Sequence, residues 1–177
     1  MGSADAEGII GSDISRHQQM EASDFDEIAF FRSIQAGGAR ALLIGRRALV
    51  LLGLPVLTAD YDFWIHVDDI ARFNDASASS GLHPSRTPEE ARRSGRYALE
   101  NDEHVDVLVA RTIPTADGQV VEFEALWQRR RSLVLAPDVA VQVPTTIDLI
   151  LTKRIAPRPK DLEDIRLLEI LRQQEQP

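Results

Sequence analysis

The stretch Leu57–Val67, with the sequence LTADYDFWIHV, limits the fold of this chain more than any other segment. Tyr61 and Phe63 alternate with polar residues, which is the period of a strand buried on one face. Asp60 and Asp62 share the opposite face and project the same way, a few ångströms apart. Because like charges at that spacing repel each other, the strand needs either a solvated face or a cation between the two acids.

Apolar segments on either side of this strand predict the rest of the architecture. A strand is expected at RALLIG, residues 40–45, and a short helix over RRALVLL, residues 46–52, which Gly53 ends. Further strands are expected at RYALEN, HVDVLVA, GQVVEFEAL and VAVQV, with a helix before the first strand, capped by Ser23, and two helices after Thr145. The order predicts an α+β fold, a small mixed sheet with flanking and C-terminal helices.

Composition bounds the class of protein. The chain has 177 residues, of which 44% are hydrophobic, so one domain with a real core is expected. Residues 1–22 are polar and aperiodic and are predicted to be a disordered leader, which leaves residues 23–177 as the domain. There is no cysteine, no apolar run of membrane-spanning length and no secretory signal, so we expect a cytoplasmic protein without membrane contact. The net charge of −8 argues against a general nucleic-acid coat protein.

A third acid stands in the strand HVDVLVA. Asp106 interrupts an apolar run, and a lone carboxylate in such a strand is costly without a partner or a metal. Together with Asp60 and Asp62 it forms a set of hard oxygen donors of the kind that Mg²⁺ prefers. For an isolated Asp-x-Asp pair, an exposed strand face with solvated aspartates is the better explanation, because the pattern is common.

The run LLIGRRALVLLGLPVLTADYDFWI resembles the opening signature of the nucleotidyltransferase superfamily of the polymerase-beta type. That signature is an apolar strand, a Gly-Gly or Gly-Ser turn, a short helix and a Thr-x-Asp-x-Asp strand. The small prokaryotic branch that includes the AbiEii toxins and minimal nucleotidyltransferases is the most similar. A C-terminal element of that branch is matched here by Lys153, Arg158, Lys160, Asp161 and Asp164, so the resemblance spans residues 42–168.

The resemblance implies a Mg²⁺-dependent transfer of a nucleoside monophosphate from an NTP to an acceptor hydroxyl. Asp60, Asp62 and Asp106 would hold the metal, with room for a two-metal site, and would be the catalytic residues. Gly45 and Lys153 would contact the nucleotide. By the same resemblance the acceptor is tRNA or a protein, and an antitoxin partner is expected.

One position departs from the signature. The second small residue of the turn is replaced by Arg46, which starts close to the expected triphosphate. Its guanidinium could clamp the phosphates, occlude them, or pair with Asp60 or Asp62 while the site is empty. Occlusion or pairing is the expectation, with weak nucleotide binding as its result.

Two other functions fit the sequence. A protein with this fold but a spoiled triphosphate seat would act as a nucleotide- or partner-binding module. An unrelated α/β protein could carry the same acids as surface residues. Glu122 and Glu124 alternate in the segment GQVVEFEAL and are interpreted as a solvated strand face.

Overall fold

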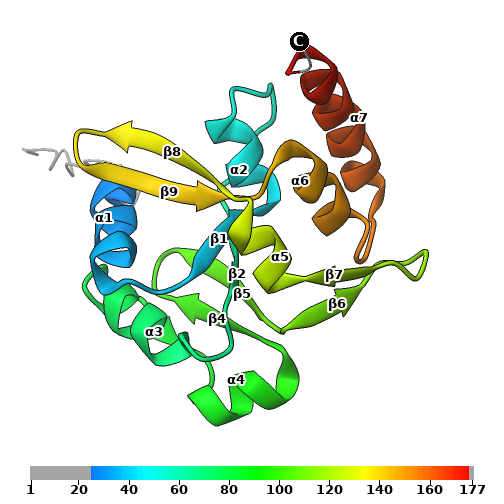
Figure 1. Ribbon diagram of the computed structural model, residues 1–177. Coiled ribbons are helices and arrows are strands. Elements are labelled where there is room, and N and C mark those ends of the chain that lie inside the picture. Colours follow the sequence, from blue (N-terminus) through cyan, green and yellow to red (C-terminus); the bar gives the residue numbers. More distant parts are fainter. Residues whose placement is uncertain (1–24, 176–177) are drawn as a thin grey trace, which may run out of the picture.

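The computed structural model describes residues 25–175, in which a five-stranded mixed sheet lies at the centre (Figure 1). The strand order is β1-β2-β5-β4-β3; β2 and β5 are parallel, and the other neighbours are antiparallel. The strands of this sheet are β1 (Ala41–Ile44), β2 (Tyr61–Ile65), β3 (His83–Pro84), β4 (Arg96–Glu100) and β5 (His104–Val109). The leader predicted over residues 1–22 lies outside the described residues.

Helices α1 and α3 lie next to each other and cover one face of the sheet (Figure 1). Aromatic side chains fill the space between the helices and the strands: Phe30 packs edge-on against Phe63, and Phe63 packs against Phe73 at 5.2 Å between ring centres. All three side chains are fully buried. The helices around this core are α1 (Glu27–Gly37), α2 (Gly45–Leu51), α3 (Ile70–Ala78) and α4 (Pro88–Ser94).

The opposite face of the sheet is only partly covered. A second apolar cluster joins Leu42 and Trp64 of the sheet to Val121, Phe123 and Leu126. Its cover is the ribbon β6 (Thr112–Pro114) and β7 (Val120–Glu122), followed by helix α5 (Phe123–Gln128). The uncovered part of this face carries the acids.

The remaining elements form a second ribbon and a helical pair. The ribbon is β8 (Arg131–Ala136) with β9 (Val139–Val143), and the pair is α6 (Thr146–Lys153) with α7 (Pro159–Gln174). Strand β9 contacts α1 and β1, while α6 and α7 pack on each other at the other side of the sheet (Figure 1). No helix among residues 25–175 is both long and apolar enough to cross a membrane.

Most predicted elements are present, but β3, β6 and β8 were not predicted, and β2 is shorter than the expected strand. Two other boundaries also differ. The strand expected over residues 118–126 ends at Glu122, because Phe123 and Leu126 bury the same face of a helical turn in the second cluster. The first helix is capped by Asp26, whose Oδ1 accepts a hydrogen bond from the backbone N–H of Ala29 at 2.9 Å. The expected cap, Ser23, lies outside the described residues.

Candidate active site

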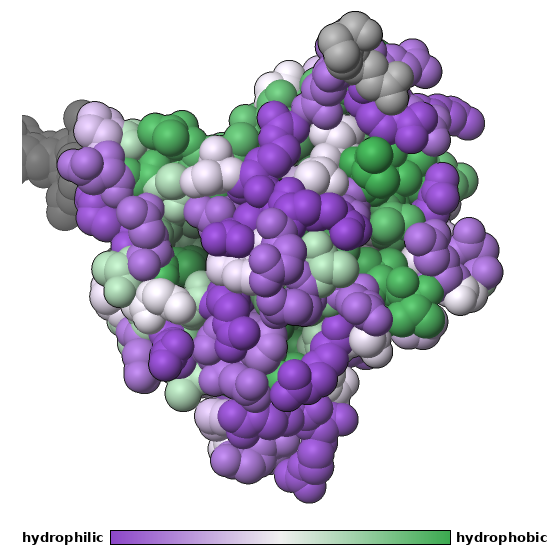
Figure 2. All heavy atoms as spheres, in the orientation of Figure 1, coloured by the Kyte–Doolittle hydropathy of each residue, from purple (hydrophilic) through white to green (hydrophobic). Residues whose placement is uncertain are grey.

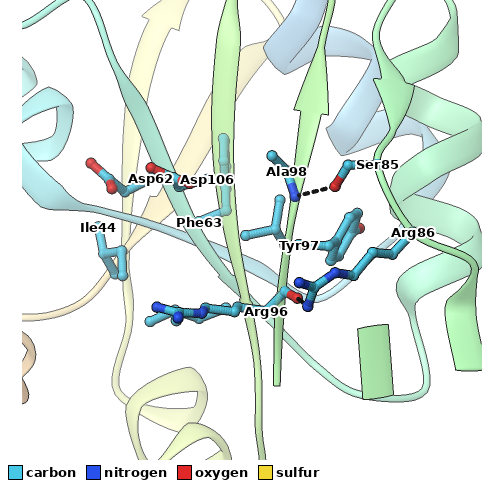
Figure 3. Close-up of a pocket in the computed structure, with 11 residues that line it drawn as sticks. Ile44, Asp62, Phe63, Ser85, Arg86, Arg96, Tyr97, Ala98 and Asp106 are labelled. Atoms are coloured by element: carbon cyan, nitrogen blue, oxygen red, sulfur yellow. Dashed lines mark hydrogen bonds between the residues drawn. The ribbon is translucent and has the colours of Figure 1, made fainter. Parts of the chain in front are cut away.

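Two carboxylates stand opposite each other on neighbouring strands. Asp62 of β2 is in register with Asp106 of the parallel strand β5. Both side chains lie on the face of the sheet that α1 and α3 leave free, and Figure 3 shows them side by side at the edge of a pocket. The strand phases predicted from the sequence therefore place the two acids together.

Asp60 lies one residue before β2 and is exposed. Its backbone N–H donates a hydrogen bond to Oγ1 of Thr58 at 3.1 Å, which fixes the turn into the strand. Asp60 lines the same cavity as Asp62 and Asp106. Asp60 therefore lies at the rim of this cavity. Across residues 25–175 no three acidic or histidine side chains stand close enough to enclose a metal ion, so Asp60 does not form a closed three-acid group with Asp62 and Asp106.

The environment of Asp62 disfavours its charge. Burial is the main cause of a raised pKa, and the neighbouring carboxylates of Asp106 and Asp60 act in the same direction. Lys153 and Arg158 oppose the shift from across the cavity but do not cancel it. A cation in the cavity would relieve this repulsion.

Asp106 is more exposed than Asp62 and has a different neighbour. Its Oδ1 lies 3.2 Å from Nε2 of His104, two residues earlier on the same strand face. His104 in turn lies 3.5 Å from Oε1 of Glu100. The second oxygen of Asp106 is left for a ligand or for the proton of a bound hydroxyl.

Gly45 is required by the position of Asp62. Its φ of +68° is a conformation that L side chains rarely adopt. A Cβ at this position would overlap Oδ2 of Asp62 and would lie 2.7 Å from its Cγ. The turn after β1 thus brings bare backbone against one of the two acids.

Three helices meet at a buried ion network. Asp164 of α7 is fully buried and lies 2.8 Å from Nζ of Lys153 and 3.0 Å from Nη2 of Arg46. Nζ of Lys153 also donates to Asp161 at 3.1 Å. A buried carboxylate needs such partners, and their separation of up to 118 positions in the sequence hides the pairing from sequence reasoning.

The network corrects the expected conformation of Arg46. Its guanidinium does not pair with Asp60 or Asp62, because Asp164 holds it through Nε and Nη2. Lys153 is likewise held by two acids. Lys160 is exposed, lines the cavity, and has no ion-pair partner within 4.0 Å in the described part of the chain.

Replacing Asp164 by asparagine is expected to lower the free energy of unfolding by about 3 kcal/mol, since two cations lose a buried counter-charge. Chemical denaturation followed by circular dichroism measures the change. The matched control is Glu163→Gln, because Glu163 is 72% exposed and lies 3.9 Å from Arg46; its effect is expected to stay within about 0.5 kcal/mol. Equal effects of the two variants would contradict a structural role for the network.

The acids lie where two cavities meet. One, of about 470 Å³, runs from Asp60 and Gly45 to the segment between α6 and α7. The other, of about 430 Å³, extends over β4 to Ser85 and Arg86. Asp62, Asp106 and Arg96 line both, so the two form one cleft with the acids at its middle.

Sequence reasoning missed Arg86 and Arg96. Arg96 pairs with Leu108 in the β4–β5 register, two positions along from the Ala98–Asp106 pair. The turn-prone Asn101 and Asp102 between two apolar runs indicated this hairpin, and its register would have placed Arg96 on the face of Asp106.

No protein-family model and no curated protein sequence matches the chain. Several solved structures match it, among them the following two. One is the candidate nucleotidyltransferase TM1012 from Thermotoga maritima, with a TM-score of 0.51 and 14% identity over 82% of this chain and 87% of that one. The other is the antibiotic-resistance factor ANT(2'')-Ia, with a TM-score of 0.53 and 16% identity over 83% of this chain and 89% of that one.

The chain has a nucleotidyltransferase fold. The predicted α+β class, with a small mixed sheet, flanking helices and C-terminal helices, is confirmed. In this nucleotidyltransferase-fold protein, the acid pair lies on the open face of the sheet, between the β1–α2 turn and the segment that joins α6 to α7.

Proposed function

We propose that this protein is a Mg²⁺-dependent nucleotidyltransferase that moves a nucleoside monophosphate from an NTP to an acceptor hydroxyl. The observation that carries the proposal is the in-register pair Asp62 and Asp106, which faces a cleft in a chain with a nucleotidyltransferase fold. Burial and the neighbouring carboxylate of Asp106 raise the pKa of Asp62, so a bound cation would stabilise the ionised pair.

The donor atoms fit magnesium. Mg²⁺ is commonly bound by one or two carboxylates together with water and substrate phosphates, so a closed protein cage is not needed. Asp62 and Asp106 would supply the carboxylates, with Asp60 at the rim as a further donor. When bound, magnesium neutralises charge on the phosphates and on the attacking and leaving oxygens.

The protein side chains then divide the work by position. The free oxygen of Asp106 accepts the proton of the acceptor hydroxyl, whose oxygen forms the new bond to the α-phosphorus of the NTP. The bond to pyrophosphate breaks, and pyrophosphate leaves. Gly45 lets the β1–α2 turn lie directly against Asp62 in the half of the cleft where the triphosphate would bind. Catalysis consists mainly of positioning and charge neutralisation.

Incubation with each α-labelled NTP, Mg²⁺ and either total tRNA or a protein extract tests the proposal. Labelled acceptor and released pyrophosphate are the expected products, and both are expected to disappear when EDTA is added. The absence of transfer to any acceptor, with every NTP and with Mg²⁺ present, would refute the activity.

Lys160, an exposed cation on the Gly45 side of the cleft, is expected to bind the triphosphate. Lys160→Ala should weaken Mg²⁺–NTP binding about tenfold in calorimetric titration, because a charge-assisted contact contributes about 1.5–3 kcal/mol. Arg166→Ala, an exposed change on the same helix outside the cleft, is the control and should bind as the wild type does. Lys153 and Arg46 are tied to Asp164, so an effect confined to variants of those two would contradict this assignment.

A second candidate function is a nucleotide- or partner-binding module without catalysis. The pairing of Arg46 and Lys153 with acids favours it, since two cations near the cleft are not free to hold phosphates. Saturable NTP binding without any transfer would identify this function. The role of toxin in a pair with an antitoxin, and tRNA or protein as acceptor, extend the first proposal and depend on the same assay.

A further inference from the structure

The half of the cleft beyond Asp106 is lined by two arginines. We infer that Arg96 and Arg86 form a site for a phosphate group of the acceptor, so that the acceptor is a phosphate-bearing molecule rather than a cation or a neutral compound. The inference rests on the proposed function and names the class of its second substrate.

Arg86 lines only the half of the cleft away from Gly45 and Lys160, whereas Arg96 lines both halves and lies where they meet. Ile44, Asp62, Asp106 and Ala98 form one row across β1, β2, β5 and β4. The backbone N–H of Ser85 continues the row by donating to the carbonyl of Ala98 at 2.9 Å. Lys160 and Gly45 line the other half of the cleft, so a molecule over Ala98 would approach Asp106 from the opposite side to the NTP.

Arg96 reaches into the cleft from the next row. It pairs with Leu108 on β5, and Figure 3 shows its side chain extending across the pocket toward Ile44. Arg86 enters from the segment after β3 and donates from Nη1 to the backbone carbonyl of Arg96 at 2.9 Å. That contact holds the guanidinium of Arg86 against the backbone of Arg96, whose own side chain extends away from it along the same wall.

Neither guanidinium is neutralised by an ion pair in the described residues. Among residues 25–175 no carboxylate lies within 4.0 Å of Arg86 or Arg96, although Asp62 and Asp106 line the same pocket. The nearest hollow outside it does contain Glu90 with Arg86 and Arg93, but Oε2 of Glu90 accepts hydrogen bonds from the backbone and hydroxyl of Thr87. Arginines with no ion pair within 4.0 Å among residues 25–175 are suited to bind phosphate, because guanidinium offers paired N–H donors.

The surroundings are hydrophilic and small. Hydrophilic side chains cover the surface around α4, which adjoins this half of the cleft (Figure 2). Ala98 opposes Asp106 in the strand register, and its small side chain leaves room beside the carboxylate. A cationic acceptor would meet two like charges here, whereas the protein as a whole is acidic, with a net charge of −8. The two arginines are therefore a local positive feature beside the carboxylates of Asp62 and Asp106.

Binding can be measured without any turnover. The probes are a short fluorescein-labelled single-stranded RNA with a free 3′-hydroxyl and, as a competitor, ribose 5-phosphate; the variants are Arg96→Glu and Arg86→Glu. Fluorescence anisotropy is expected to show at least about tenfold weaker RNA binding for each, with a shallower salt dependence, because a phosphate contact is lost. Arg32→Glu is the matched control, since Arg32 is exposed on α1 over the other face of the sheet; it should bind as the wild type does.

The outcomes separate the inference from the proposed function. If RNA binding depends on Arg96 and ribose 5-phosphate displaces the RNA only at far higher concentration, the site binds a polynucleotide end. If ribose 5-phosphate displaces the RNA effectively, the site binds a small sugar phosphate. If RNA binding depends on Arg96 but no nucleotidyl transfer occurs, the phosphate site is supported and the proposed enzyme activity is wrong. If Arg96→Glu transfers nucleotide to a protein or another phosphate-free acceptor at the wild-type rate, the inference is wrong and the proposed enzyme activity stands. The inference is also wrong if the wild-type protein binds neither probe.

Discussion

Gly45→Ala is expected to abolish nucleotidyl transfer and to lower the free energy of unfolding by about 4 kcal/mol. About 1–2 kcal/mol comes from holding an L residue at φ +68°. The remainder comes from the added Cβ, which overlaps the carboxylate of Asp62 and forces either that side chain or the β1–α2 turn to move. Urea denaturation and the transfer assay measure the two effects.

Gly38 provides a matched control for the backbone term. It has the same φ of +68°, and a Cβ there would meet no atom within 4 Å. Gly38→Ala should therefore cost about 1–2 kcal/mol and leave the transfer reaction unchanged. In a Gly45→Ala, Asp62→Gly double variant, part of the stability lost by Gly45→Ala should return, since the overlapping carboxylate is gone. Equal costs at Gly38 and Gly45 would show that the close approach to Asp62 has no energetic weight.

Asp62→Asn is expected to lower the rate of transfer on the order of 1,000-fold, because the loss of one metal-binding carboxylate removes about 4 kcal/mol of transition-state stabilisation. The same variant should be at least as stable as the wild type when Mg²⁺ is absent, since it removes the repulsion from Asp106 and Asp60. Asp75→Asn, an exposed change on α3, is the control and should alter neither property.

The pH dependence of stability gives an independent readout for Asp62. Its pKa in the folded protein lies above the ordinary value of 3.8. Between the two pKa values the folded protein binds more protons than the unfolded chain, so the free energy of unfolding falls as pH rises through that interval. In Asp62→Asn this part of the fall should be missing. Identical pH profiles for the two proteins would contradict the raised pKa.

The positions of Asp62 and Asp106 were predictable because successive side chains of a strand alternate between its two faces. Alternation in residues 61–65 and 104–109 fixes which side chains share a face, and the apolar partners of Asp62 and Asp106 leave only one phase for each strand. The structure adds the register that sets the two acids opposite each other. Their roles as metal ligands stay predictions until the assays above are done.

The contacts of Arg46 were not predictable in the same way. Its nearest acids in the sequence are Asp60 and Asp62, and the expected pairing followed from that proximity. In the structure Arg46 pairs with Asp164 instead. A fully buried carboxylate on α7 needs a cationic partner more than an exposed acid such as Asp60 does. Helix α5 was missed for a related reason: Phe123 and Leu126 are read as a strand until the cluster that buries them is known.

The ion pair between Arg46 and Asp164 also bears on how the protein matures during synthesis. The two residues are 118 positions apart, and the second lies within the last helix. A chain still attached to the ribosome therefore carries the β1–α2 turn and both strands of the acid pair long before α7 is available to tie that turn down. The cleft is expected to reach its final shape only after α7 has been synthesised, so the growing chain passes through a period in which its sheet can form and its catalytic geometry cannot.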